Sequence, residues 1–91
     1  MSHKIELVPD FDHCIETVAK KKYAELTQIL LYCKADNDEI AEKLETLRLF
    51  LGTADFRKLR SESEKQLIEG ESVRFSVWIK GRALKYEMNI I

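Results

Sequence analysis

Proline and glycine are scarce in this sequence, which has one proline and three glycines among 91 residues. A disordered chain or a loop-rich disulfide scaffold would contain more of both and fewer large apolar side chains. Hydrophobic residues make up 45% and charged residues 34% of the sequence. These proportions are typical of a globular protein, and we expect a single domain over residues 1–91 with one modest core.

An excess of either charge is also lacking. Fifteen basic and sixteen acidic residues give a net charge of −1, so no overall field draws the chain to nucleic acid or to an anionic membrane. We expect no membrane partner, because no run approaches the ~20 apolar residues of a membrane span. The first residues also lack the apolar stretch of a signal peptide.

Cysteine is limited to Cys14 and Cys33. Both fall in one predicted helix, where nineteen residues at about 1.5 Å each separate them by ~28 Å, far beyond the ~7 Å limit for a disulfide. We therefore expect free thiols and a cytoplasmic location. His13 and Cys14 are adjacent and would point about 100° apart on a helix, so we expect neither a metal site nor another cofactor.

Motifs for catalysis are absent as well. The sequence has no glycine-rich phosphate loop, no Gly-x-Ser-x-Gly turn and no histidine that would orient a cysteine, apart from the adjacent His13. The carboxylates within residues 36–45 fall on the polar side of one predicted helix, which is typical of a solvated surface. We expect a protein without enzymatic activity.

The clearest pattern lies in the last twenty-one residues. Apolar and polar side chains alternate over residues 73–80 and again from Leu84 to Ile90, which predicts a β-hairpin. If Lys80 and Gly81 form a two-residue loop, all inward side chains are apolar and Arg74 lies opposite Glu87. A three-residue loop would need a bulge, whereas a four-residue loop would keep the faces but lose that charge pair.

Three helices and a short strand are predicted before the hairpin. Residues 4–8 alternate weakly as far as Pro9 and predict a strand beside the hairpin. Apolar spacings of three and four predict helices from about His13 to Cys33, from a cap at Asp36 to Gly52, and from a cap at Thr53 or Asp55 to Gly70. The predicted fold is α+β, in the order β-α-α-α-β-β, with three helices packed on a small antiparallel sheet.

Apolar side chains outside the expected core are the main functional signal. Exposed apolar surface and open strand edges are where protein chains pair. We therefore predict a protein-interaction or homo-oligomerisation module, with a homodimer as the simplest form. The predicted partner-binding residues are Leu31, Tyr32, Phe50, Trp78 and Ile91. The other possibility is that the helices cover all of these side chains within one monomer.

Nucleic-acid binding is the alternative function. Basic residues surround Trp78 in the hairpin and begin the third helix, and cations beside an exposed aromatic ring suit a phosphate backbone and a stacked base. The candidate residues are Arg57, Lys58, Arg60, Arg74, Trp78, Lys80, Arg82 and Lys85. Three helices followed by a hairpin resemble the element order of winged-helix domains, and residues 38–44 resemble the first helix of a helix-turn-helix pair. The sequence departs from that pattern after Leu44, where the helical spacing continues instead of turning.

Overall fold

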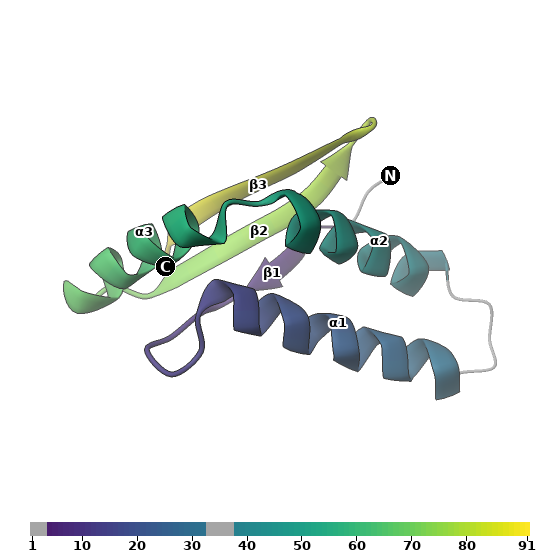
Figure 1. Cartoon of the computed structure of the whole chain (residues 1–91), viewed down its shortest axis with the longest axis horizontal. Coiled ribbons are helices and arrows are strands. Elements are labelled where there is room, and N and C mark those ends of the chain that lie inside the picture. Colours follow the sequence, from purple (N-terminus) through teal and green to yellow (C-terminus); the bar gives the residue numbers. More distant parts are fainter. Residues whose placement is uncertain (1–3, 33–37) are drawn as a thin grey trace.

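The computed structural model describes residues 4–32 and 38–91. The helices are α1 (Ile15–Tyr32), α2 (Asp38–Thr53) and α3 (Phe56–Ile68), and the strands are β1 (Ile5–Leu7), β2 (Val73–Lys80) and β3 (Ala83–Ile90). The strands form one antiparallel sheet in the order β1-β2-β3 (Figure 1). The α+β class and the order β-α-α-α-β-β are confirmed, and the N-terminal strand joins the sheet beside β2. Within the described ranges, no helix has the length and apolar character needed to cross a bilayer.

The helices pack on one face of the sheet. Val73, Phe75 and Val77 of β2 are completely buried on that face. Ile5 and Leu7 of β1 extend this buried layer to one side, with 3% and 2% of their surface exposed. The full core cluster is Ile5, Leu7, Ile15, Ala19, Leu26, Leu47, Phe50, Leu59, Val73, Phe75 and Val77. Every helix contributes to this cluster and β3 does not, so the core is centred on β2 and lies toward β1.

The hairpin pairs in a register two residues away from the predicted one. Lys80 lies opposite Ala83, so Gly81 and Arg82 form the loop. The loop has the predicted length but begins one residue later, because its first position needs the positive φ that Gly81 adopts (+65°) and that a lysine would adopt only with strain. The shift preserves both faces of the hairpin, but Arg74 lies opposite Asn89 instead of Glu87.

A turn closed by the Asp10 carboxylate precedes α1, and the helix begins later in the sequence than predicted. Asp10 Oδ1 accepts hydrogen bonds from the backbone N–H groups of Asp12 (2.9 Å) and His13 (2.7 Å). These bonds close a turn before the helix, so α1 begins at Ile15 and not at about His13. The predictions for Cys33 and for a cap at Asp36 lie outside the described residues.

The ends of α2 and α3 differ in how well they were predicted. α2 continues through Gly52 to Thr53, although the glycine was expected to follow the helix. α3 begins as expected at Asp55, whose side chain accepts from the N–H of Lys58 at 3.2 Å. It ends at Ile68, and Gly70 follows with a φ of +88° and donates its N–H to the Leu67 carbonyl at 3.0 Å. The next N–H donates to the carbonyl of residue 66, which completes a Schellman motif.

Candidate interaction surface

β3 is an outer strand of the sheet, eight residues long, and runs along the margin of the molecule opposite α1 (Figure 1). The side chains on its helix-facing side are Leu84, Tyr86, Met88 and Ile90, which lie opposite the inward residues of β2. Tyr86 and Ile90 keep 40% and 52% of their surface exposed, and Leu84 and Met88 are only partly buried. The helical layer therefore covers β3 only in part.

The backbone of β3 also has a free side. Ile91 N–H donates to the Ser72 carbonyl at 2.8 Å, so these two residues form a hydrogen-bonded pair. Bonded and non-bonded pairs alternate along an antiparallel ladder, and the odd-numbered residues of β3 therefore bond to β2. The N–H and C=O groups of the even-numbered residues point away from β2. We call these four residues, Leu84, Tyr86, Met88 and Ile90, the β3 edge.

Trp78 lies on the face of the sheet that the helices leave open. Lys4 Nζ lies 4.5 Å from the centroid of the Trp78 ring, a distance typical of a cation–π contact. Lys85 lies opposite Trp78 on β3, and nearby Arg74 Nε lies 2.9 Å from Glu6 Oε2. Trp78 is accordingly half-buried by its own neighbours.

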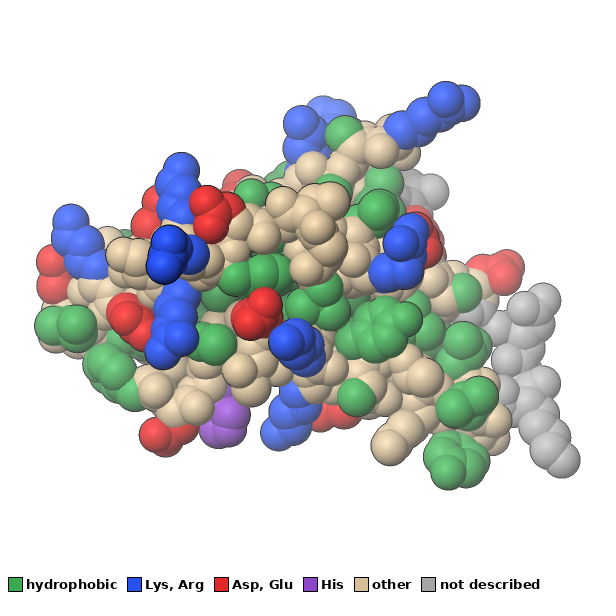
Figure 2. Space-filling view, viewed as in Figure 1, with side chains coloured by type: hydrophobic (Ala, Val, Ile, Leu, Met, Phe, Trp, Pro, Cys, Tyr) green, Lys and Arg blue, Asp and Glu red, His purple; other side chains and the backbone are tan. Residues whose placement is uncertain are grey.

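Leu31 and Tyr32 are exposed at the end of α1, with 74% and 84% of their surface accessible. Apolar side chains gather at this end of the helix in Figure 2, where Ile29 and Tyr32 line a shallow groove. Ile91 is 63% exposed just beyond β3. These residues and Trp78 lie on different parts of the molecule, so the predicted partner-binding residues do not form one continuous surface.

Phe50 lies in the core, so its prediction as an exposed partner-binding residue was wrong. Its side chain is completely buried, and its ring meets those of Phe56 and Tyr86 edge to face, at centroid distances of 5.1 and 5.4 Å. α2 packs against both α1 and the sheet, so it buries a wider apolar stripe than its spacings of three and four predicted. Phe50 consequently contacts the β3 edge from inside.

The predicted nucleic-acid residues fall into separate groups. Arg57, Lys58 and Arg60 lie on α3, on the helix-covered side of the sheet. Arg74, Trp78, Lys80 and Lys85 lie on the open face, and Arg82 lies in the hairpin loop; basic side chains are visible at the hairpin tip in Figure 2. α2 is continuous from Asp38 to Thr53, so the turn of a helix-turn-helix pair is not formed after Leu44. The two basic groups therefore do not share one surface.

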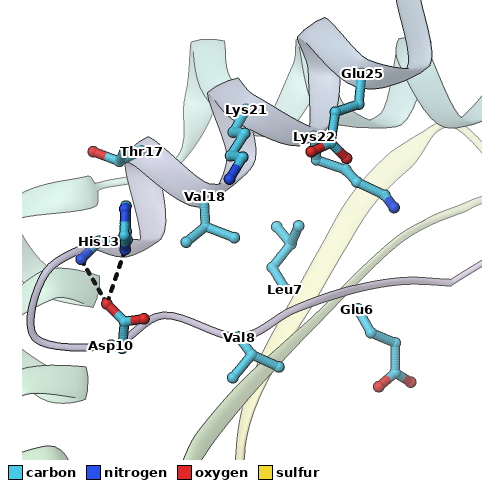
Figure 3. Close-up of a pocket in the computed structure, with 10 residues that line it drawn as sticks. All are labelled: Glu6, Leu7, Val8, Asp10, His13, Thr17, Val18, Lys21, Lys22 and Glu25. Carbon is cyan, nitrogen blue, oxygen red and sulfur yellow. Dashed lines mark hydrogen bonds and ion pairs between the residues drawn. The ribbon is translucent and has the colours of Figure 1, made fainter. Parts of the chain in front are cut away.

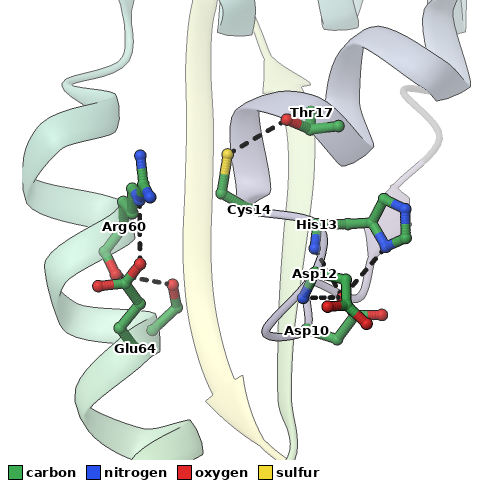
Figure 4. Close-up of polar contacts among 8 residues, drawn as sticks. Asp10, Asp12, His13, Cys14, Thr17, Arg60 and Glu64 are labelled. Atoms are coloured by element: carbon green, nitrogen blue, oxygen red, sulfur yellow. Dashed lines mark hydrogen bonds and ion pairs between the residues drawn. The ribbon is translucent and has the colours of Figure 1, made fainter.

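Cys14 occupies the position just before α1, where it lines a pocket of about 350 Å³ together with Arg57 and Arg60 of α3. Its Sγ lies 3.3 Å from Thr17 Oγ1 (Figure 4). The Thr17 hydroxyl, followed by the Thr17 amide, lowers the pKa of the Cys14 thiol, and Arg60 adds a smaller effect. The lowered pKa of this thiol was not predicted, because Cys14 was expected inside the helix; the Cys-x-x-Thr spacing at the helix start was the available signal.

A second pocket, of about 360 Å³, lies between β1 and α1 (Figure 3). Val18 and Lys21 point into it from α1, and Asp10 bonds His13 at one end. Hydrogen bonding from the His13 amide is the main cause that lowers the pKa of Asp10. The charged side chains around the pocket have both signs, so its charge selects no ligand. Within the described residues, no three His, Cys, Asp or Glu side chains are placed to hold a metal ion.

Comparison with known proteins assigns the chain to a family. The model of an uncharacterised protein family matches residues 1–88. The chain belongs to this family. It is also similar to an uncharacterised protein of Archaeoglobus fulgidus, with 54% identity over 52 residues, which are 53% of this chain and 59% of the archaeal protein. The chain thus spans about 59% of the length of this relative. No solved structure matches the chain.

Proposed function

We propose that this protein is a non-enzymatic interaction module that associates through the β3 edge, with itself or with another protein chain. One observation carries the proposal: the same four residues combine outward-directed backbone groups with apolar side chains that the helices leave partly exposed. A strand added beside β3 would pair with the backbone groups and cover the side chains at the same time.

The β3 edge lacks most of the features that discourage strand pairing. β3 contains no proline, and it pairs with β2 residue by residue without a bulge. Its open face carries Lys85 and Glu87, whose charges cancel. β1, the other outer strand, is only three residues long and is followed within two residues by Pro9. Short strands and proline discourage pairing, so β3 is the edge at which a partner strand would add.

Met88→Pro tests the β3 edge without opening the hairpin. The Met88 N–H points away from β2, so proline removes a donor from the free edge and none from the β2–β3 ladder. Met88→Ala is the matched control, because it shortens the side chain but keeps the N–H. We expect the mass of the wild type, measured by light scattering, to rise with concentration. The mass of Met88→Ala should begin to rise only at higher concentration. Met88→Pro should keep the mass of a monomer.

Circular dichroism should show the same secondary structure for both variants, since both keep the β2–β3 ladder. Equal association of Met88→Pro and Met88→Ala would contradict pairing through this edge.

Nucleic-acid binding on the open sheet face is a second candidate function. Trp78 supports it, because Lys4 and Lys85 lie beside the ring. A stacked base would have to displace Lys4. Titrating the fluorescence of Trp78 with single- and double-stranded oligonucleotides tests this function, and binding should weaken steeply as salt rises. An unchanged signal in dilute buffer would rule it out.

We also propose a cytoplasmic location. The free thiol of Cys14 supports it, because unpaired cysteines persist in reducing compartments.

A further inference from the structure

We infer that the partner at the β3 edge is a second copy of this chain, paired about a two-fold axis that passes beside Tyr86. The inference rests on the proposed function and adds to it the identity of the partner and the register. Tyr86 then lies opposite the partner's Tyr86, and Leu84 opposite the partner's Met88. On the other face of the extended sheet, Lys85 lies opposite the partner's Glu87.

Backbone geometry restricts the registers that two copies can adopt. A two-fold axis perpendicular to the sheet places the two β3 strands antiparallel. The outward N–H and C=O groups belong to the even-numbered residues, so these must face even-numbered residues of the partner to form hydrogen-bonded pairs. The same condition keeps the apolar side chains of both copies on the helix-covered face.

Charge then selects one register. Lys85 and Glu87 lie two residues apart on the open face of β3, flanked by the uncharged Ala83 and Asn89. With the axis at Tyr86, each Lys85 lies opposite the partner's Glu87, at a non-hydrogen-bonded site where opposing side chains are closest. An axis at Lys85 would oppose two lysines, and an axis at Glu87 would oppose two glutamates. Larger shifts pair fewer residues.

The same register brings the partly exposed apolar side chains together. Tyr86 is 40% exposed and its ring lies 5.4 Å from that of Phe50, which supports it from the core. Around the axis, Tyr86 would contact the partner's Tyr86, with Leu84 and Met88 beside the partner's Met88 and Leu84. Two three-stranded sheets would thus form one sheet with a continuous apolar face.

Charge reversal tests this register. Lys85→Glu and Glu87→Lys each set like charges opposite one another twice per dimer, so we expect the dissociation constant to rise roughly 10- to 100-fold. The double variant Lys85→Glu/Glu87→Lys restores opposite charges and should dimerise like the wild type. Lys80→Glu, on the same face but on β2, is the control and should leave the dimer unchanged. Sedimentation equilibrium measures each constant.

A mixture of the two single variants provides a second measurement. Each variant alone should be largely monomeric, whereas Lys85→Glu and Glu87→Lys together should form a heterodimer, because both cross-strand pairs then join opposite charges. Native mass spectrometry detects this species when one variant carries ¹⁵N. A wild type that stays monomeric at every concentration would overturn the second copy as partner. A wild-type dimer whose single variants dimerise equally well would overturn the register. The proposed function fails separately if the wild type dimerises and Met88→Pro dimerises as well as Met88→Ala, because association would then not use the β3 edge.

Discussion

At the scale of single residues, the contacts of Cys14 at the start of α1 bear on the reactivity of its thiol. Its thiol has a lowered pKa, chiefly because the Thr17 hydroxyl and amide stabilise the charged form. Thiolate is the reactive form of cysteine, so a lower pKa extends reactivity to lower pH. We expect the rate of Cys14 alkylation by iodoacetamide, measured against pH in a Cys33→Ser background, to reach half its maximum below the usual cysteine value of about 8.5.

Removing the Thr17 hydroxyl should reverse part of this effect. In Thr17→Val the thiolate loses its first stabilising contact, so the midpoint of the pH profile should move upward. Thr27→Val is the matched control, since that hydroxyl donates to the Tyr23 carbonyl within the same helix and is remote from Cys14 in sequence. Identical profiles for the two variants would show that Thr17 does not set the pKa of Cys14.

At the level of elements, the effect of a Gly→Ala substitution on stability depends on whether the glycine lies within a helix or follows its end. Neither Gly52 nor Gly70 has a neighbouring atom that an added Cβ would meet. Gly52 lies inside α2, whereas Gly70 follows α3 with a φ of +88°. We expect Gly52→Ala to raise the free energy of unfolding by about 0.5–1 kcal/mol, because alanine favours the helix. Gly70→Ala should lower it by about 1–2 kcal/mol, because alanine is strained at that φ.

Urea denaturation of the two variants measures both changes. A loss of stability in Gly52→Ala would indicate that α2 ends before this glycine, as the sequence pattern suggested.

The elements were predictable to different degrees for physical reasons. The two faces of the hairpin follow from a period of two, which a two-residue shift leaves unchanged, so they were predicted correctly. The register of the hairpin depends on which residue adopts a positive φ at the first position of the loop. Glycine adopts this φ most readily, so the position of Gly81 could have predicted the register. Helix starts were less predictable, because the Asp10 turn competes with the first turn of α1.

The candidate interaction site was harder to predict from the sequence than the helices and strands. Leu84, Tyr86 and Met88 have the same alternation as the residues of β2, and nothing in that pattern shows that the helices cover β3 only in part. The prediction for Phe50 was wrong in the opposite direction: the residue was expected to be exposed but is buried, because α2 packs against both α1 and the sheet. How far one layer extends over another is a property of tertiary packing, and no local spacing encodes it.

For the whole molecule, the emission of Trp78 distinguishes edge pairing from packing between open sheet faces. Edge pairing leaves the open face free, so we expect the emission maximum to stay nearly constant when a concentrated sample is diluted to monomer. Packing between open faces would bury the ring, and dilution would then shift the emission to longer wavelength. Lys4→Ala should cause such a shift at every concentration, because the Lys4 ammonium lies 4.5 Å from the ring centroid. Lys80→Ala is the control.

The two edge strands of the sheet differ, and this difference would limit how far copies of the chain can assemble. A subunit that could pair on both sides would polymerise, each added copy exposing a fresh strand for the next. β1 has three residues, followed within two residues by Pro9, so the proposed pairing would leave each copy only one strand at which to bind another. Two-fold pairing through β3 would occupy that strand on both copies. The proposed complex would then end at two subunits, and the strand that joins them would no longer be available to nucleate fibres.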